Sequence, residues 1–173
     1  MVEKGRLDLA LVDEFLTQTP FLGNRGLYHF TPVVEEEVIL ACSQKYYSHA
    51  IDEDHSFKNL ARQNFITFRH SAQTVKNWFR HHFGNDKAPF NVVLVVDSLQ
   101  AITSAIRHHL GMGVIATHLV KEEITAGDII PITTAKPVII NQISIVNLQD
   151  NVPSLAERVF DKFLKEKIKS MGI

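Results

Sequence analysis

The sequence predicts an α/β protein with a largely parallel sheet, and three observations support this fold class. Short apolar runs alternate with amphipathic helical patterns along the 173 residues, as they do in successive strand–helix units. Apolar residues make up 45% of the chain and charged residues 21%, a globular composition that argues against disorder. The longest apolar runs are far shorter than the ~20 residues that a membrane-spanning helix needs. The length suits one domain or two small lobes.

Proline, glycine and polar residues divide the first third of the chain into short elements. Gly5 is expected to end a helix, and Pro20 and Gly23 mark a loop because both residue types interrupt regular structure. Pro32 is expected to separate two strands. The predicted elements are a strand over Leu7–Val12, a loop over Asp13–Asn24, strands over Leu27–Phe30 and Glu36–Cys42, and a helix over Ser56–Gln63 that Ser56 caps.

The rest of the chain is more regular. Serine residues stand where helices are expected to begin and glycines where they end, which are the usual capping positions. Asn91–Val96 is β-branched and apolar, as in a buried parallel strand. The predicted strands are Asn64–Phe68, Asn91–Val96, Gly113–Ala116, Asp128–Ile132 and Val138–Leu148. The predicted helices run from Ser71 to Phe83, with Val75, Trp78, Phe79 and Phe83 on one stripe, from Ser98 to Leu110, and from Ser154 to Met171. In the last helix, Ser154 and Glu157 form a capping box ahead of an apolar stripe of Leu155, Val159, Phe160, Phe163, Leu164 and Ile168.

Composition and motifs exclude several functions. The formal net charge of −1 does not suit a nucleic-acid-binding surface. Gly111-Met112-Gly113 follows a helix and is not continued by a third glycine, unlike a dinucleotide-binding loop. The histidine pairs His81-His82 and His108-His109 are neighbours on helices, so they do not converge on one metal ion and are expected at the surface or in caps. Cys42, at the end of a strand, is expected to be a small buried hydrophobe.

Two predicted strand-to-helix turns carry polar residues. Arg69-His70-Ser71 follows the strand at Asn64, and Asp97-Ser98 follows the strand at Asn91. Open α/β sheets bind ligands at the carboxyl ends of their strands, where helix amide groups favour anions. These turns are candidates for a ligand cleft, although Ser71 and Ser98 are expected to act as helix caps in any case.

Several segments resemble the effector-binding domain of LysR-type transcriptional regulators. Leu99–Val120, LQAITSAIRHHLGMGVIATHLV, is similar to the helix-G-x-G-strand segment of that family, and Lys4–Leu11 resembles its turn and first visible strand. Glu36–Cys42 resembles a strand that crosses between lobes. Lys121–Ile130, KEEITAGDII, resembles a short helix, glycine and strand of that family. Ser154–Lys167 resembles the helix that closes the family's domain. Together the segments span nearly the whole chain.

The resemblance implies a two-lobed fold like the type 2 periplasmic binding proteins, with mixed sheets and an incomplete first lobe. The first lobe is expected to hold residues 1–34 and 149–173 and the second residues 35–148, with hinge crossovers near 33–41 and 142–148. A small-molecule effector, anionic or a carboxylate, would bind between them. The expected contacts are Arg69, His70, Ser71, Asp97, Ser98 and Thr117. The family's first strand and helix, its second strand and its winged helix-turn-helix have no counterpart in this sequence.

The resemblance therefore predicts a ligand-sensing domain that catalyses no reaction and reaches DNA only through a helix-turn-helix domain. No cofactor or metal is expected. A cytoplasmic location is expected because the N-terminus has no apolar stretch of signal-peptide length, and pairing with a second copy is expected because the strand over Leu7–Val12 has an edge without a neighbour. A free-standing solute-binding protein of the same fold is the alternative. An enzyme is a third, with His70 or His118 and Asp97 as the candidate base and its partner.

Overall fold

The computed structural model describes residues 7–13, 25–150 and 152–171. The chain packs as two units, one of residues 1–36 with 140–173 and one of residues 37–139; we call them unit 1 and unit 2. Two long strands run from one unit into the other: β2 (Tyr28–Ser43) leaves unit 1, and β7 (Ile139–Leu148) returns to it. None of the helices in the described ranges has both the length and the apolar character that crossing a bilayer requires.

Strands of both directions make up one seven-stranded sheet, so the sheet is mixed, as the family resemblance implies. The largely parallel sheet predicted from the alternation of strands and helices is wrong, because both connecting strands, β2 and β7, pair antiparallel. Its order is β1-β7-β2-β5-β3-β4, and β6 pairs with β2. The remaining strands are β1 (Ala10–Asp13), β3 (Asn64–Thr67), β4 (Asn91–Val95), β5 (Met112–Ala116) and β6 (Ile129–Pro131). The helices are α1 (Gln44–Tyr46), a π-helical turn over Tyr47–Ile51, α2 (Phe57–Leu60), α3 (Gln73–Phe83), α4 (Leu99–Arg107), α5 (Lys121–Ala126) and α6 (Leu155–Met171), with 3₁₀ turns at Arg25–Leu27 and Thr117–Val120.

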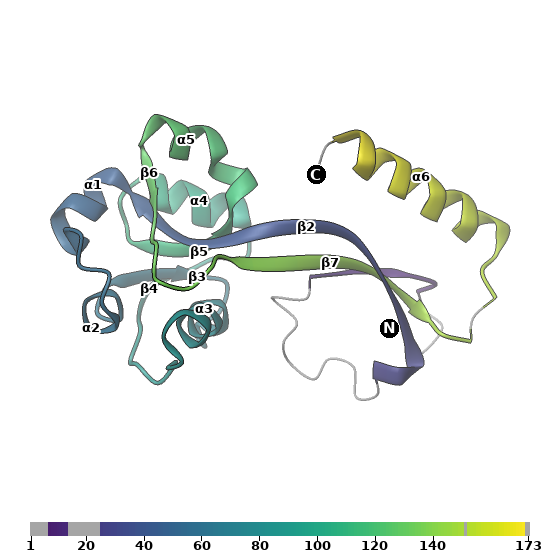
Figure 1. Ribbon diagram of the computed structural model, residues 1–173, viewed down its shortest axis with the longest axis horizontal. Coiled ribbons are helices and arrows are strands. Elements are labelled where there is room, and N and C mark those ends of the chain that lie inside the picture. Colours follow the sequence, from purple (N-terminus) through teal and green to yellow (C-terminus); the bar gives the residue numbers. More distant parts are fainter. Residues whose placement is uncertain (1–6, 14–24, 151, 172–173) are drawn as a thin grey trace. The chain divides into compact units, whose positions relative to one another are not determined.

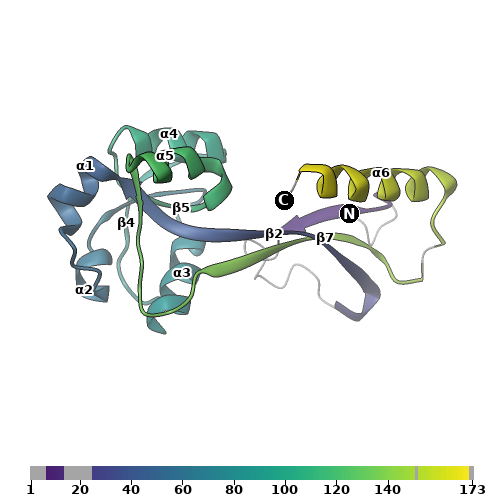
Figure 2. The same cartoon turned by 45° about the horizontal axis from the view of Figure 1, so that its top comes forward.

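In unit 2, the sheet is covered on both faces. Successive residues of a strand point to opposite faces, and in β3 the side chain of Phe65 stacks on Phe79 of α3, whereas Ile66 packs with Ile102 and Ile106 of α4. Figures 1 and 2 show α4 and α5 on one side of these strands and α3 on the other. Trp78 and Phe79 of α3 are at most 1% exposed, so the prediction that these two aromatics pack in the core is confirmed.

Two glycines allow elements of unit 2 to approach closely. A Cβ atom built on Gly111 would lie 2.5 Å from the backbone oxygen of Asn64. A Cβ atom on Gly113 would lie 2.8 Å from Ile102 and 2.9 Å from Ile106. Gly111 therefore lets the chain enter β5 beside the start of β3, and Gly113 lets α4 sit on β5. The Gly-Met-Gly sequence thus has a packing role.

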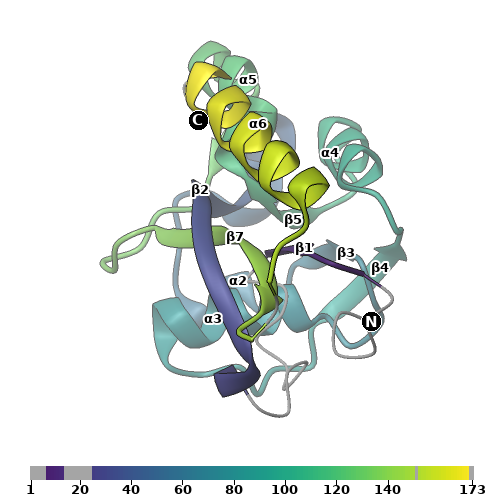
Figure 3. The ribbon, with the colours of Figure 1, turned by 90° about the vertical axis from the view of Figure 1, so that its right-hand side faces the viewer.

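Unit 1 contains β1 paired antiparallel with β7, the first part of β2, and α6 on one side of these strands (Figure 3). The predicted capping box begins α6: the amide of Glu157 donates to Ser154 Oγ (3.2 Å), and the amide of Ser154 donates to Glu157 Oε2 (2.6 Å). The predicted apolar stripe is largely exposed, since Leu155, Val159, Phe160 and Phe163 are 49–75% accessible.

Three predictions of local structure are wrong. Pro32 lies inside the continuous strand β2. In the described part of the chain, β5 pairs with β2 only at Val38–Ala41, so Pro32 lies outside that ladder. β4 is not buried: Val93 is 45% exposed, because β4 ends the sheet.

The third error concerns the start of α3. The N-cap is Ala72, not Ser71, with φ 50° and ψ 37°.

Among the other predictions, the strand over Leu7–Val12 is observed as β1 from Ala10. The predicted helix end at Gly5 and nearly all of the predicted loop over Asp13–Asn24 lie outside the described residues.

We expect Gly111→Ala to lower the free energy of unfolding by about 3 kcal/mol, because the new methyl group meets rigid backbone at Asn64. Gly84→Ala is the matched control: Gly84 has φ +69° and open space around its Cβ position, so only left-handed strain of about 1 kcal/mol applies. Chemical denaturation measures both variants. Equal losses would contradict the close-approach role of Gly111.

Candidate functional site

Three turns of unit 2 meet at one edge of the sheet because β3 is parallel to both of its neighbours. Its register pairs Thr67 with Val95 of β4 and Ile66 with Gly113 of β5. Parallel strands place their carboxyl ends at the same edge. The residues that follow β3, β4 and β5 therefore lie next to one another, and we call this group of turns the sheet-edge site.

The turn after β3 is held by the backbone and by one buried threonine. Thr67, 1% exposed, donates from Oγ1 to the carbonyl oxygen of Arg69 (2.8 Å), and that oxygen also accepts from the amide of Ala72 (2.9 Å). Arg69, His70 and Ser71 are thereby presented on the surface as exposed side chains. Ala72 is 3% exposed in a left-handed conformation that costs about 1 kcal/mol, and strain of this kind concentrates at functional turns.

The turn after β4 agrees with the prediction. Ser98 is the N-cap of α4 and accepts from the amide of Ala101 (3.4 Å), while its hydroxyl donates to Gln100 Oε1 (2.8 Å). Asp97 beside it is exposed. The amide of Val96 donates to the carbonyl oxygen of Thr67 (3.0 Å), which ties this turn to the end of β3.

Thr117 stands at the end of β5. It is half-buried and opens a 3₁₀ turn, and its Oγ1 donates to the carbonyl oxygen of Glu37 in β2 (3.2 Å). All six predicted contact residues thus lie on the three turns that share the sheet edge. Sequence reasoning missed Thr67, whose position at the last residue of a strand before a polar turn was the available signal.

The arrangement can bind an anion but does not provide the groups for a reaction. Arg69 supplies positive charge, and the first turns of α3 and α4 point amide N–H groups outward from the carboxyl edge. Ala72 has a methyl side chain that cannot accept from the first turn of α3, so those amides are left for solvent or a ligand. Cys42 is fully buried, and burial raises the pKa of its thiol to about 12, so it behaves as a small hydrophobe, as predicted.

One histidine of unit 2 was predicted wrongly. His82 was expected at the surface, yet it is 8% exposed and its ring stacks on Trp78 at 4.1 Å. Burial, followed by the charges of His81 and Lys136, lowers the pKa of His82 from 6.5 to about 4. The spacing Val75–Phe79–His82 repeats every three to four residues, so the helical period could have placed His82 on the buried stripe.

These observations define the class of protein: an α/β domain built from two units joined by two long strands. The sequence matches the family model of the LysR substrate binding domain over residues 1–169, and the chain therefore belongs to that family. This is a non-enzymatic family, and it supports the effector-binding domain that the sequence predicts.

Solved structures share the fold at low sequence identity. The C-terminal domains of a LysR family protein from Agrobacterium tumefaciens are 17% identical with a TM-score of 0.74, covering 98% of this chain and 76% of that one. The CcmR regulatory domain of Synechocystis, in complex with 2-PG, is 18% identical with a TM-score of 0.70, covering 98% and 77%. The effector binding domain of QuiR, in complex with shikimate, is 14% identical with a TM-score of 0.65, covering 98% and 75%. No curated protein matches the chain in sequence.

The two serines of the sheet-edge site give a matched test of the local geometry. We expect Ser98→Ala to lower the free energy of unfolding by about 1 kcal/mol through loss of the cap. Ser71→Ala should change it by less than about 0.5 kcal/mol, as exposed substitutions away from caps usually do. Equal losses in urea denaturation would show that Ser71 also acts as a cap.

The buried histidine predicts a pH dependence. Because the pKa of His82 is lowered on folding, the unfolded chain binds more protons between pH 6.5 and pH 4. The contribution of His82 to the free energy of unfolding is therefore complete above pH 6.5. This contribution, on the order of 2 kcal/mol, is lost as the pH falls to about 4. The charged or titratable groups around it are His81, Lys136 and Glu37.

Denaturant unfolding at several pH values measures this effect. In His82→Phe, which keeps an aromatic ring on Trp78 but does not titrate, the loss of stability between pH 6.5 and pH 4.5 should be smaller. His108→Phe is the control, because His108 is exposed and should keep the wild-type slope. A wild-type slope in His82→Phe would contradict the assignment.

Proposed function

We propose that this chain is the effector-sensing domain of a LysR-type transcriptional regulator, and that a small molecule binds at the sheet-edge site through Arg69, His70, Ser71, Asp97, Ser98 and Thr117. The observation that carries the proposal is the parallel placement of β3 between β4 and β5, which brings these residues to one edge. The complexes of CcmR with 2-PG and of QuiR with shikimate support a small-molecule ligand for a domain of this fold.

The effector is an anion or a carboxylate. Arg69 provides a charged donor that suits a carboxylate, and the amide groups at the starts of α3 and α4 favour negative charge. Ser98 and Thr117 have hydroxyl groups that are already engaged within the chain, so they position the turns and accept or share hydrogen bonds with the ligand.

The response to the effector depends on two lobes. We take residues 1–34 with 149–173 as one lobe and residues 35–148 as the other, with the hinge near 33–41 and 142–148. The hinge ranges fall within or next to the long strands β2 and β7, which run between the units. An effector that binds one arrangement of the lobes better shifts the population toward it, and a helix-turn-helix domain outside this sequence, working in the cytoplasm, transmits the shift to DNA.

A thermal-shift screen with small carboxylates, including 2-PG and shikimate, tests the site. A specific ligand raises the melting temperature by mass action. For any ligand found, Arg69→Gln should weaken binding by roughly 10-fold or more, the value of a charge-assisted hydrogen bond. Arg62→Gln is the matched control, because Arg62 is exposed and precedes β3, at the opposite end of the same strand. Unchanged affinity in Arg69→Gln would overturn the proposed site.

We further propose that the domain pairs with a second copy through α6. Glu157, Asp161 and Lys165 of α6 are half-buried and follow one another at four-residue spacing. Together with residues of the strands, they line a cavity of about 240 Å³. Four large apolar side chains of α6 are exposed: Leu155, Val159, Phe160 and Phe163. Leu164 and Ile168 are half-buried. A contiguous exposed apolar face of this kind marks an interaction surface.

Sedimentation equilibrium at micromolar concentration tests the pairing. We expect the wild-type chain to exceed 19.6 kDa and Phe163→Asp to shift it toward that mass, because a charge on the apolar face opposes burial. Lys162→Asp is the control, since Lys162 is exposed and lies beside that face. A monomeric wild type would contradict the proposal.

A further inference from the structure

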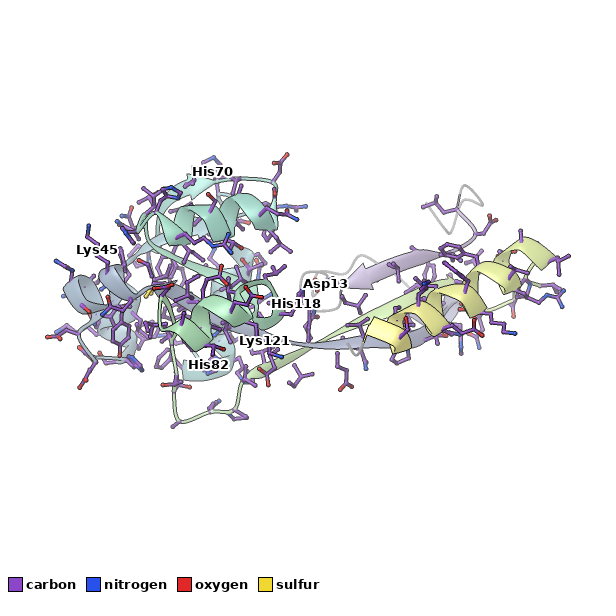
Figure 4. All side chains as sticks on the ribbon, turned by 90° about the horizontal axis from the view of Figure 1, so that it is seen from above. Asp13, Lys45, His70, His82, His118 and Lys121 are labelled. Carbon is purple, nitrogen blue, oxygen red and sulfur yellow. The ribbon has the colours of Figure 1, made fainter. Side chains whose placement is uncertain are left out.

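Unit 2 contains a cavity of about 250 Å³ that is separate from the sheet-edge site. Its walls come from the part of β2 at 37–39, from Trp78 and His82 of α3, and from the segment 131–138 that leads from β6 to β7. Figure 4 shows His70, on the turn after β3, and His82 on opposite sides of this unit. We call this space the His82 cavity.

His82 has a polar atom that the protein leaves unsatisfied. Its Nδ1 atom lies 2.7 Å from Thr134 Oγ1. Its Nε2 atom is buried and has no hydrogen-bond partner among the residues that the structure describes. Buried polar atoms in native proteins are nearly always paired, so an unpaired ring nitrogen on a residue that lines a cavity points to recognition of a ligand.

The hydrogen bonds around Thr134 indicate what Nε2 offers. Thr134 Oγ1 already accepts from the amide of Lys136 (3.2 Å), so its hydroxyl proton is free to be donated to His82 Nδ1. The ring is neutral at pH 7, because burial holds the pKa of His82 at about 4. A neutral ring that accepts at Nδ1 carries its proton at Nε2, and Nε2 is then a donor.

The rest of the lining suits an amphipathic acid. Val38, Ile39 and the indole of Trp78 form an apolar wall, and Lys136 adds an ammonium group beside Thr134. Glu37 also lines the cavity and is exposed. With one cation and one carboxylate in the lining, a ligand with a single negative charge is accommodated better than a dicarboxylate.

We propose that the His82 cavity is a second ligand site, which binds a small monocarboxylate with an apolar body. The carboxylate pairs with Lys136, and it accepts from His82 Nε2–H once the side chains that cover this atom move aside. The body packs on Trp78, Val38 and Ile39. The volume is below the range of ~300–1,000 Å³ typical of drug-sized ligands, so the ligand has about ten heavy atoms.

A ligand in this cavity would contact residues of both connections between unit 2 and unit 1. Glu37 and Val38 belong to β2 where it enters the unit, and Val138 directly precedes β7. A ligand here contacts both connections at once and would therefore bias the hinge. This regulatory consequence rests on the proposed function, whereas binding itself does not.

Trp78 is the one tryptophan of the sequence, so its fluorescence reports on this cavity. We would titrate the chain with cyclohexanecarboxylate at pH 7, and with cyclohexanecarboxamide as the uncharged molecule of the same size. Neither probe absorbs where indole is excited. The expected result is a saturable change with the acid, and binding at least 10-fold weaker for the amide.

Three variants decide between the cavity and the sheet-edge site. Lys136→Met, at an exposed position that folding tolerates, should weaken binding of the acid at least 10-fold, and His82→Phe should do the same. Arg69→Gln should leave the affinity unchanged. A change that never saturates, equal binding of acid and amide, or unchanged affinity in Lys136→Met would overturn the proposal. A loss confined to Arg69→Gln would place the probe at the sheet edge and equally overturn it, while leaving the proposed function intact.

Discussion

The parallel pairing of β3 with both β4 and β5 is the constraint on which the functional part of this domain depends. A central strand with two parallel neighbours requires each connection to cross back over the sheet, and α3 and α4 make these crossings on opposite faces. The same pairing collects the turns after the three strands at one edge. Gly111 allows it, because any side chain there would meet the backbone of Asn64 at the start of β3.

Several features of the fold could be predicted from sequence because their causes are local. The caps at Ser56, Ser98 and Ser154 depend on a side chain and an amide two or three residues apart, and the structure has all three. The strands of unit 2 and the buried aromatic stripe of α3 follow from apolar spacing in the same way. The positions of the polar turns were predictable for this reason, because they follow from where the strands end.

The errors arise where distant residues decide the outcome. Ser71 has the chemistry of a cap, but Ala72 adopts a left-handed conformation in a turn fixed by Thr67 and the carbonyl of Arg69, and the helix begins one residue later. Pro32 lies in a strand that continues through it to the residues paired with β5, and that distant pairing could not be predicted from the residues around Pro32. The apolar stripe of α6 has helical spacing, yet four of its six residues are exposed, and the half-buried face carries Glu157, Asp161 and Lys165 beside Leu164 and Ile168. Spacing predicts which residues share a face but not which face is turned inward.

The polar groups of unit 2 differ in how completely the protein satisfies them, and this difference separates structural roles from ligand recognition. Thr67, Ser98 and Thr117 all have their hydroxyls engaged at the sheet edge, so they hold turns in place. In the site that we propose there, recognition would fall to Arg69 and to backbone amides. In the His82 cavity, Thr134 is engaged by its own loop, and His82 Nε2 is unpaired among the described residues. The sheet edge thus offers charge on a rigid frame, whereas the cavity offers one buried donor on an apolar wall. The two proposed sites would therefore select acids that differ in their apolar part. Because residues 37–39 of β2 and Val138, next to β7, line the cavity, its ligand would modulate the response of the domain to the effector at the sheet edge.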